Sequence, residues 1–317
     1  MERPTSDEKV LAALAHASVL LAFLGPIGAT LIWAFQRDKS KYVRFHALQA
    51  MGYQALAFWF WFIGIFVFMF GGVFLMIILG GISTFNDSGT SDPSFLPFII
   101  QPIIVLSMFG LWGLFFFTGI IGAVFCMIDR DFQYPLIGHW LKQKLFREGI
   151  TEAETEEWED NWVGGVCHST AILQLWGMII PLIVWVLEKD RSSKLRFQAL
   201  QATLYQLIAM VIYMVCMAGY MGSFFFMFAG IMIFGPDGPT SSPNEALPPL
   251  MGIVFLIFLA IILMIILVIT VGGPLYILLA GIASLLTIRG RDFKYPILGN
   301  LIAQRINVRR KEPSPIP

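Results

Sequence analysis

Charged side chains are scarce in this chain of 317 residues, and their scarcity excludes a water-soluble protein. Charged residues are 13% of the sequence and hydrophobic residues 57%, whereas a soluble domain has about 25% charged residues. Residues 55–80 and 251–287 contain no charged residue. Uncharged apolar runs of 18 or more residues are typical of membrane-spanning helices. The expected fold class is therefore an all-α polytopic membrane protein.

Cysteine is also scarce, and the few cysteines are scattered. Cys126, Cys167 and Cys216 all lie in apolar stretches, and none belongs to a C-x-x-C pair. This excludes a disulfide framework and a structural zinc motif. Cys167 and His168 are adjacent, so on a helix they point to different sides. We expect no metal and no cofactor from the sequence.

Motifs for catalysis and for nucleic-acid binding are missing as well. There is no G-x-S-x-G, P-loop or H-E-x-x-H. The formal net charge is zero, so no nucleic-acid partner is expected. Every aspartate and glutamate lies in a predicted loop, linker or terminus, which argues against an ion-coupled transporter. The sequence therefore predicts a protein that is not an enzyme.

What the chain does contain is a duplication. A basic turn, residues 37–44, leads into the segment Phe-His-Ala-Leu-Gln-Ala, and 152 positions later residues 189–196 lead into Phe-Gln-Ala-Leu-Gln-Ala. Asp-Phe-x-Tyr-Pro occurs at residues 131–135 and again at residues 292–296, a shift larger by nine. So many matches in one order indicate a tandem repeat. We predict a first repeat at residues 9–147, an acidic cytoplasmic linker at 148–161, a second repeat at 162–306 and a tail at 307–317.

The basic residues also predict a topology. Four basic stretches occur, at residues 37–44, 130–147, 189–196 and 289–311, while residues 80–97 and 235–249 contain no Lys or Arg. Because cytoplasmic loops are enriched in Lys and Arg, all four stretches and both termini are expected in the cytoplasm. The first segment of each repeat must then enter and return as a broken hairpin, followed by two long transmembrane helices, and the repeats are parallel. A straight first helix with inverted repeats is the alternative.

A polar stripe opens each predicted long helix. It contains a histidine, glutamines and tyrosines that fall within one arc of the helix. The stripe lines a cytoplasmic cavity, or it forms hydrogen bonds between helices, which we favour. Its members are His46, Gln49, Tyr53, Gln54, Gln198, Gln201, Tyr205 and Gln206.

Two histidines recur inside apolar segments, at His16 and His168. A histidine there could carry protons or sense pH, but a hydrogen bond to a neighbouring helix is the interpretation we favour. Arg44 and Arg196 lie where helices enter the membrane. We expect them to pair with Asp131 and Asp292, as a clamp on the cytoplasmic face.

The acidic stretch at residues 151–160 is interpreted as a solvated linker helix, with a binding site for a basic partner as the alternative.

Several of these motifs together resemble the Tic20-like family, in the bacterial branch known as DUF4870. They include His16, Gly25-Pro26, Trp33, the segment at residues 44–50 and Tyr134-Pro135, and the second repeat matches again. The resemblance implies a compact bundle of four helical segments per copy. Chloroplast members belong to a protein import machinery, and no catalytic residue is carried over.

The expected function is a Tic20-like membrane protein of the bacterial cytoplasmic membrane that handles or inserts polypeptides, or scaffolds a membrane complex. Its expected partners are the lipid bilayer, other membrane proteins and polypeptide substrates in protein transport. A small-solute transporter or channel between the repeats is the alternative.

Overall fold

The computed structural model describes residues 3–85, 95–234 and 249–311, and all regular structure in these ranges is helical. The stretches without Lys or Arg, residues 80–97 and 235–249, lie in part outside these residues. Five segments are long and apolar enough to cross a membrane: Ser6–Gln36, Lys41–Gly72, Pro102–Met127, Ser193–Gly230 and Phe255–Ile288.

The first of these segments is broken in the middle. Helix α1 (Ser6–Ala17) begins with a capping box between Thr5 and Glu8, because each reaches the other's backbone N–H. A 3₁₀ segment, η1 (Ser18–Leu24), follows, and Ala22 at φ 51° turns the chain. Helix α2 (Gly25–Gln36) starts with a proline in its first turn. It runs back beside α1, so that Glu8 lies near Ser40 just beyond the end of α2.

Two long helices and a short one complete the first half. Helix α3 (Lys41–Phe85) and helix α4 (Phe95–Met127) form a long hairpin. Lys9 in α1 forms an ion pair with Asp129 just after α4, at an N–O distance of 3.1 Å. The ends of α1 and α4 therefore meet at one end of the bundle. The short helix α5 (Ile137–Leu145) carries the basic residues that follow.

The second half begins inside the predicted linker. Helix α6 (Glu152–Ser169) continues from the acidic stretch into the apolar segment without a break. The 3₁₀ segment η2 (Thr170–Trp176) turns the chain at Gln174, whose φ is 50°, and helix α7 (Ile179–Glu188) runs back. A Cβ at Gly177 would lie 1.9 Å from the carbonyl oxygen of Thr170, so only glycine permits this reversal.

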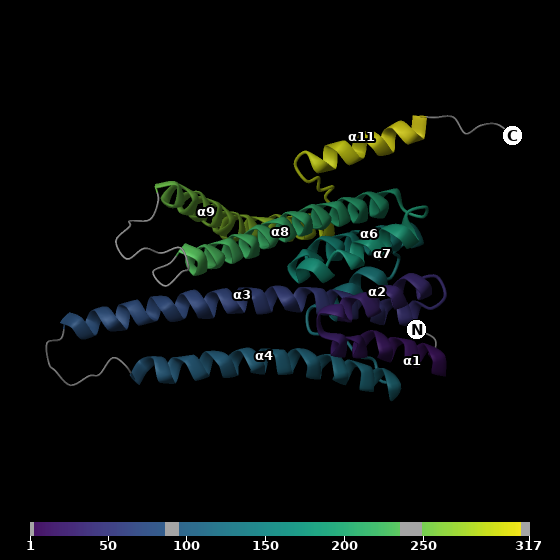
Figure 1. The fold of residues 1–317 in the computed structure, drawn as a ribbon. Coiled ribbons are helices and arrows are strands. Elements are labelled where there is room, and N and C mark those ends of the chain that lie inside the picture. Colours follow the sequence, from purple (N-terminus) through teal and green to yellow (C-terminus); the bar gives the residue numbers. More distant parts are fainter. Residues whose placement is uncertain (1–2, 86–94, 235–248, 312–317) are drawn as a thin grey trace.

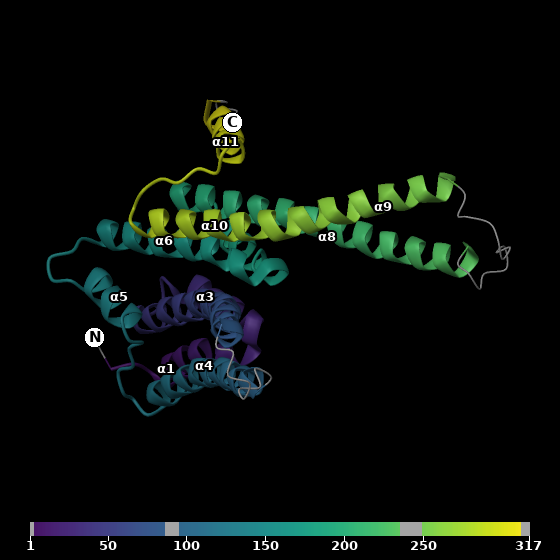
Figure 2. The same ribbon diagram turned by 90° about the vertical axis from the view of Figure 1, so that its left-hand side faces the viewer.

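The remaining elements form the second long hairpin. Helix α8 (Ser193–Phe234) pairs with a helix broken by one π-turn, made of α9 (Pro249–Leu267), η3 (Val268–Gly272) and α10 (Gly273–Ile288). The last helix, α11 (Leu298–Lys311), extends away from the rest of the bundle in Figures 1 and 2, while part of it contacts α8.

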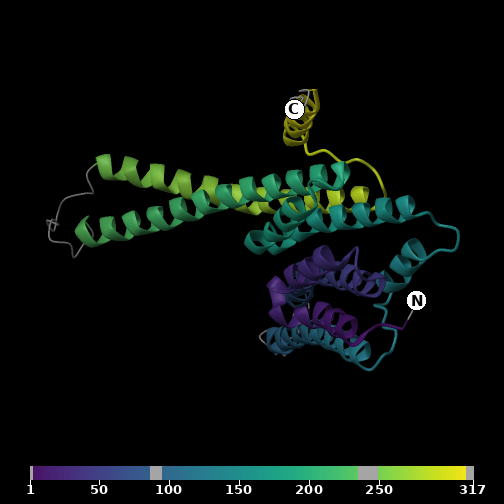
Figure 3. The ribbon, with the colours of Figure 1, turned by 90° about the vertical axis from the view of Figure 1, so that its right-hand side faces the viewer.

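The two long hairpins share a base and then diverge. Figures 2 and 3 show α8 and α9 lengthwise, whereas α3 and α4 are seen nearly end-on. The two halves touch chiefly where α2 meets α7 and α3 meets α6, and the Trp59 ring of α3 also lies against Gly281 of α10. Because the two hairpins point in different directions, the predicted parallel arrangement of two repeats is not confirmed.

The core lies at this shared base. Trp33, Leu48 and Trp162 pack in one buried cluster drawn from both halves. A Cβ at Gly52 would lie 2.1 Å from the Trp162 ring, so the absence of a side chain lets α6 approach α3. Farther out, large apolar side chains such as Phe70 (66% exposed) and Leu106 (70% exposed) face outward. Such a surface requires lipid around it, so the chain is a membrane protein in contact with the bilayer.

Candidate functional site

A buried histidine network lies at the base of the first half. His16 occupies the last turn of α1, and His46 the second turn of α3. The Nε2 atom of His16 lies 3.0 Å from Nδ1 of His46, and its Nδ1 lies 2.9 Å from the Tyr134 hydroxyl. All three side chains are fully buried. Helix α1 ends one residue after His16 and the chain reverses at Ala22, so that His16 lies beside the start of α3.

Gln49 joins this network to the extended segment that follows α4. Its Nε2 donates to the Phe132 carbonyl oxygen at 3.0 Å, and its Oε1 accepts from the Tyr134 N–H at 3.2 Å. Residues 130–134 are not helical and have no ladder for these backbone groups. One side-chain amide thus satisfies a buried donor and a buried acceptor that would otherwise each cost about 1–3 kcal/mol.

The rest of the first polar stripe also bonds between helices. Gln54 donates to the Ala15 carbonyl oxygen at 3.2 Å and bonds the Ser18 hydroxyl. Tyr53 donates to the Phe115 carbonyl oxygen at 3.3 Å, and its ring stacks on Tyr134 at 3.9 Å. The stripe is therefore packed against α1, α4 and the segment after α4, and one of its members, Tyr53, also borders a mostly apolar pocket beside Trp61 and Trp112.

The second half repeats most of these contacts. His168 bonds the Tyr295 hydroxyl at 3.1 Å and the Oε1 of Gln198 at 2.9 Å. Gln201 bonds the Phe293 carbonyl oxygen and the Tyr295 N–H. Two further members of the stripe behave as their counterparts do: Gln206 donates to the Cys167 carbonyl oxygen and Tyr205 stacks on Tyr295 at 3.8 Å.

Cys126 belongs to the first network, and reasoning from the sequence missed it. Its Sγ lies 3.5 Å from Nδ1 of His46, and the ligand atoms of His16, His46 and Cys126 all lie within 4.8 Å of one another. The sequence carried one signal for this position. With the shift of 161 that matches the two Asp-Phe-x-Tyr-Pro segments, Cys126 corresponds to Thr287, so both repeats place a side chain with a polarisable or polar atom here. In the structure Thr287 is also fully buried.

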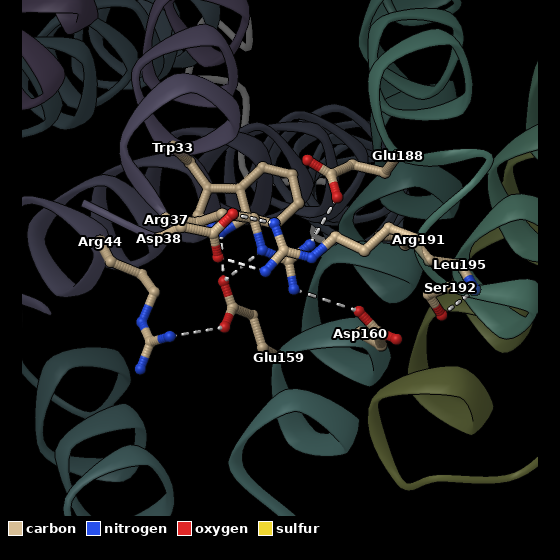
Figure 4. Close-up of polar contacts among 10 residues, drawn as sticks. All are labelled: Trp33, Arg37, Asp38, Arg44, Glu159, Asp160, Glu188, Arg191, Ser192 and Leu195. Atoms are coloured by element: carbon tan, nitrogen blue, oxygen red, sulfur yellow. Dashed lines mark hydrogen bonds and ion pairs between the residues drawn. The ribbon is translucent and has the colours of Figure 1, made fainter. Parts of the chain in front are cut away.

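A second polar cluster, which we call the ionic junction, joins the two halves (Figure 4). It consists of Arg37 and Arg44 from the first half and Glu159, Asp160 and Glu188 from the second. Arg37, at the end of α2, lies 2.8 Å from Glu188, 3.7 Å from Glu159 and 3.8 Å from Asp160. Arg44 lies 3.6 Å from Glu159, which also accepts from the Trp33 indole N–H at 2.5 Å.

The junction is buried, so its charges depend on one another. Glu159 is fully buried and the side chain of Arg37 only 3% exposed. Burial raises the pKa of Glu159 because it disfavours the charged carboxylate, while Arg37 and Arg44 act in the opposite direction. Burial raises the pKa of Asp160 as well. Next to the junction, Arg191 forms a bidentate pair with Asp38 at the surface.

These contacts correct two expectations from the sequence. The clamp between Arg44 and Asp131 does not form, because Arg44 compensates the buried Glu159 and Asp131 bonds Lys142 of α5 at 2.8 Å. Burial raises the pKa of Asp131, but the bonds from Lys142 and Gln133 outweigh it, and the pKa lies below its usual value. Arg196 and Asp292 form no ion pair in the described part of the chain.

The acidic stretch is not solvated throughout either. Its last acids, Glu159 and Asp160, are buried against arginines of the same chain. The sequence carried a signal for this, since an acidic stretch leads directly into an apolar segment while two basic turns lack partners.

Comparison with known proteins assigns the family. The family model described as "Magnetosome magnetite crystal formation protein family" (MamF/MmsF) matches residues 7–141 and again residues 159–302. The chain therefore belongs to the MamF/MmsF family. No curated protein and no solved structure matches the chain.

This match overturns the resemblance to the Tic20-like family and DUF4870. The role in polypeptide handling and protein transport rested on that resemblance and is wrong, and the alternative of a solute transporter is abandoned with it. Short apolar-rich motifs do not distinguish families that share a membrane environment, since lipid selects the same residue types in each.

Proposed function

We propose that this chain takes part in magnetite crystal formation as an integral protein of a magnetosome membrane. The observation that carries the proposal is the family match, which covers both halves of the chain separately. The helical, lipid-facing surface supports a role within a membrane. The proposed role is non-enzymatic.

The proposal includes an arrangement in the membrane. Both halves are placed as parallel copies, each a broken hairpin followed by a long hairpin, with the basic turns and both termini on the cytoplasmic face. The gathering of residues 37–44, 130 and 189–191 near the ends of the short helices supports this placement. The 45-residue α3 is about 67 Å long, more than twice the hydrocarbon core of about 30 Å. Because α3 is longer than the membrane is thick, it can cross the membrane at a tilt, and the diverging hairpins require such a tilt.

Deletion of the gene tests the role. In a magnetite-forming cell that carries it, we expect electron microscopy to show an altered distribution of crystal sizes. The wild-type chain supplied in trans should restore that distribution. Unchanged crystals in the deletion strain would contradict the proposal.

Labelling of single cysteines tests the arrangement. In sealed, isolated magnetosomes the cytoplasmic face points outward, so cysteines placed at Lys39 and Lys189 should react with a membrane-impermeant thiol reagent. A cysteine within residues 80–97 should react only after the vesicles are opened. Labelling of only one of the two basic turns in sealed vesicles would instead favour inverted halves.

A further inference from the structure

Three potential donors converge on a single atom of the first histidine network. Nδ1 of His46 lies 3.0 Å from Nε2 of His16, 3.0 Å from Nε2 of Gln49 and 3.5 Å from Sγ of Cys126. An imidazole nitrogen that accepts has one lone pair. Three donors therefore compete for one acceptor position.

The other tautomer of His46 does not relieve this conflict. The amide of Gln49 is held by the Phe132 carbonyl and the Tyr134 N–H, so it can present only an N–H to His46. If Nδ1 of His46 carried the proton, two N–H groups would face each other. If Nδ1 accepts, the proton is on Nε2, and Nε2 of His46 is buried without a hydrogen-bond partner. In either tautomer, hydrogen bonds alone leave Nδ1 of His46 facing more groups than it can bond.

We propose that His16, His46 and Cys126 form a binding site for a divalent transition-metal ion. In a tetrahedral site with metal–nitrogen distances of about 2.0–2.1 Å and a metal–sulfur distance of about 2.3 Å, ligand nitrogens lie about 3.3 Å apart. A nitrogen and a sulfur in such a site lie about 3.6 Å apart. The distances from Nδ1 of His46, 3.0 Å to Nε2 of His16 and 3.5 Å to Sγ of Cys126, are close to these values, and the third pair of ligand atoms lies within 4.8 Å.

The donor set defines the class of ion. Two imidazoles and a thiolate suit Zn²⁺ and neighbouring first-row ions rather than Mg²⁺ or Ca²⁺, which prefer oxygen ligands. Cys126 binds as the thiolate and releases its proton to solvent, and both imidazoles bind in the neutral form. The Tyr134 hydroxyl, bonded to Nδ1 of His16, orients that ring so that Nε2 points at the site.

His46 follows the basic turn at residues 37–44 by two positions, and Cys126 lies in the last turn of α4, so the site is close to the end of the bundle where Lys9 pairs with Asp129. The half-buried ring of Tyr42, in the first turn of α3, lies over His46 with ring centroids 4.4 Å apart.

The second half provides a comparison, because it lacks two of the three proposed ligands. Gln198 stands where the first half has His46, and Thr287 where it has Cys126. Oε1 of Gln198 has two lone pairs and accepts from His168 at 2.9 Å and from Gln201 at 2.5 Å. Gln198 therefore accommodates both donors without an ion. The Thr287 hydroxyl is buried without a hydrogen-bond partner, but a hydroxyl is a much poorer ligand for such an ion than a thiolate, so the proposal assigns a metal site to the first half alone.

The test is the metal content of the purified chain. Full-length protein with a histidine-free tag is reduced, stripped with chelator in detergent, and loaded with Zn²⁺ or Co²⁺. We expect one bound ion per chain by mass spectrometry of the metal, and for Co²⁺ a thiolate charge-transfer band with the intense visible bands of a tetrahedral site. The readout does not involve magnetite, so it is independent of the proposed function.

Two matched variants make the test decisive. His46→Gln with Cys126→Thr gives the first half the residues of the second. We expect the affinity for Zn²⁺ and Co²⁺ to fall by more than about 100-fold, which is more than the loss of a residue that only supports a ligand would cause. Gln198→His with Thr287→Cys gives the second half the residues of the first, and should bind a second ion. Cys216→Ser should change nothing.

Three results would overturn the proposal. The first is a wild-type chain that binds neither Zn²⁺ nor Co²⁺. The second is a His46→Gln, Cys126→Thr variant that binds the ion as tightly as the wild-type chain does. The third is a Co²⁺ spectrum with no thiolate band. Circular dichroism of the chelated proteins controls for folding. If the double variant does not fold, Cys126→Ser alone decides, because it must lose the thiolate band.

Discussion

Residues at equivalent positions of the two halves have different surroundings: some are buried and paired in one half and exposed or unpaired in the other, among the described residues. Arg44 in the first half compensates the buried Glu159, while its counterpart Arg196 forms no ion pair in the described part of the chain. Glu159 itself falls, with the shift of 152, on the exposed Asp7. The difference teaches that position in a repeat does not determine burial. At the junction the basic residues of the first half meet acids of the second, and beside it Asp38 of the first half pairs with Arg191 of the second.

Removing the buried acid should give the largest effect. Glu159→Ala leaves Arg37 and Arg44 without their shared carboxylate, and breaking a buried pair costs about 3–5 kcal/mol. Asp7→Ala, at the equivalent exposed position, should leave stability unchanged. Unfolding in detergent, followed by circular dichroism, measures both. Equal effects would mean that the junction contributes no more than a surface pair.

A second test asks whether the two glutamines that bond the segments after α4 and α10 are equivalent. Gln49→Ala leaves the buried Phe132 carbonyl and the Tyr134 N–H without their side-chain partner, whereas in Gln201→Ala the Phe293 carbonyl keeps a bond from Gln198 at 3.4 Å. We expect Gln49→Ala to lower the free energy of unfolding by about 1–3 kcal/mol for each of the two groups, and Gln201→Ala to lower it by less. Equal costs at the two positions, in the same unfolding assay, would contradict this difference between the halves.

Exchanging the residues that distinguish the histidine networks should have a smaller effect without metal. In chelator, Gln198→His replaces an oxygen with two lone pairs by a nitrogen with one, so one donor of His168 or Gln201 is lost, at about 1 kcal/mol. His46→Gln should cost less, because it relieves the competition at Nδ1. Thermal melting of the chelated proteins measures both, and the reverse order would remove the basis for distinguishing the networks.

The smallest expected effect is on the pH dependence of stability, through the exposed ion pair between Asp38 and Arg191. The bond from Arg191 lowers the pKa of Asp38. A lowered carboxyl pKa stabilises the folded state above the unfolded value of about 3.9 and loses this contribution as the pH falls through the folded pKa. Asp38→Asn should therefore reduce the loss of stability between neutral and acidic pH, by less than about 1 kcal/mol because the pair is exposed.

Much of the local structure could be predicted from residue patterns. The long apolar helices, the breaks in the segments containing Gly25 and Gly177, and the basic turns follow from composition, glycine and proline. The partners of the charged residues could not be predicted in this way. Asp131 and Lys142 are 11 positions apart, and their pairing depends on how α5 folds back after Leu136.

The sequence by itself determined the helical membrane class and the matched positions of the two halves, because apolar run length and repeated motifs are properties of the chain alone. Only the tertiary structure decided which acid compensates which arginine, and that Cys126 lies beside His16 and His46. Those contacts join residues about 80 to 150 positions apart. Their formation depends on where helices end and how closely they pack, and neither is written in a local pattern.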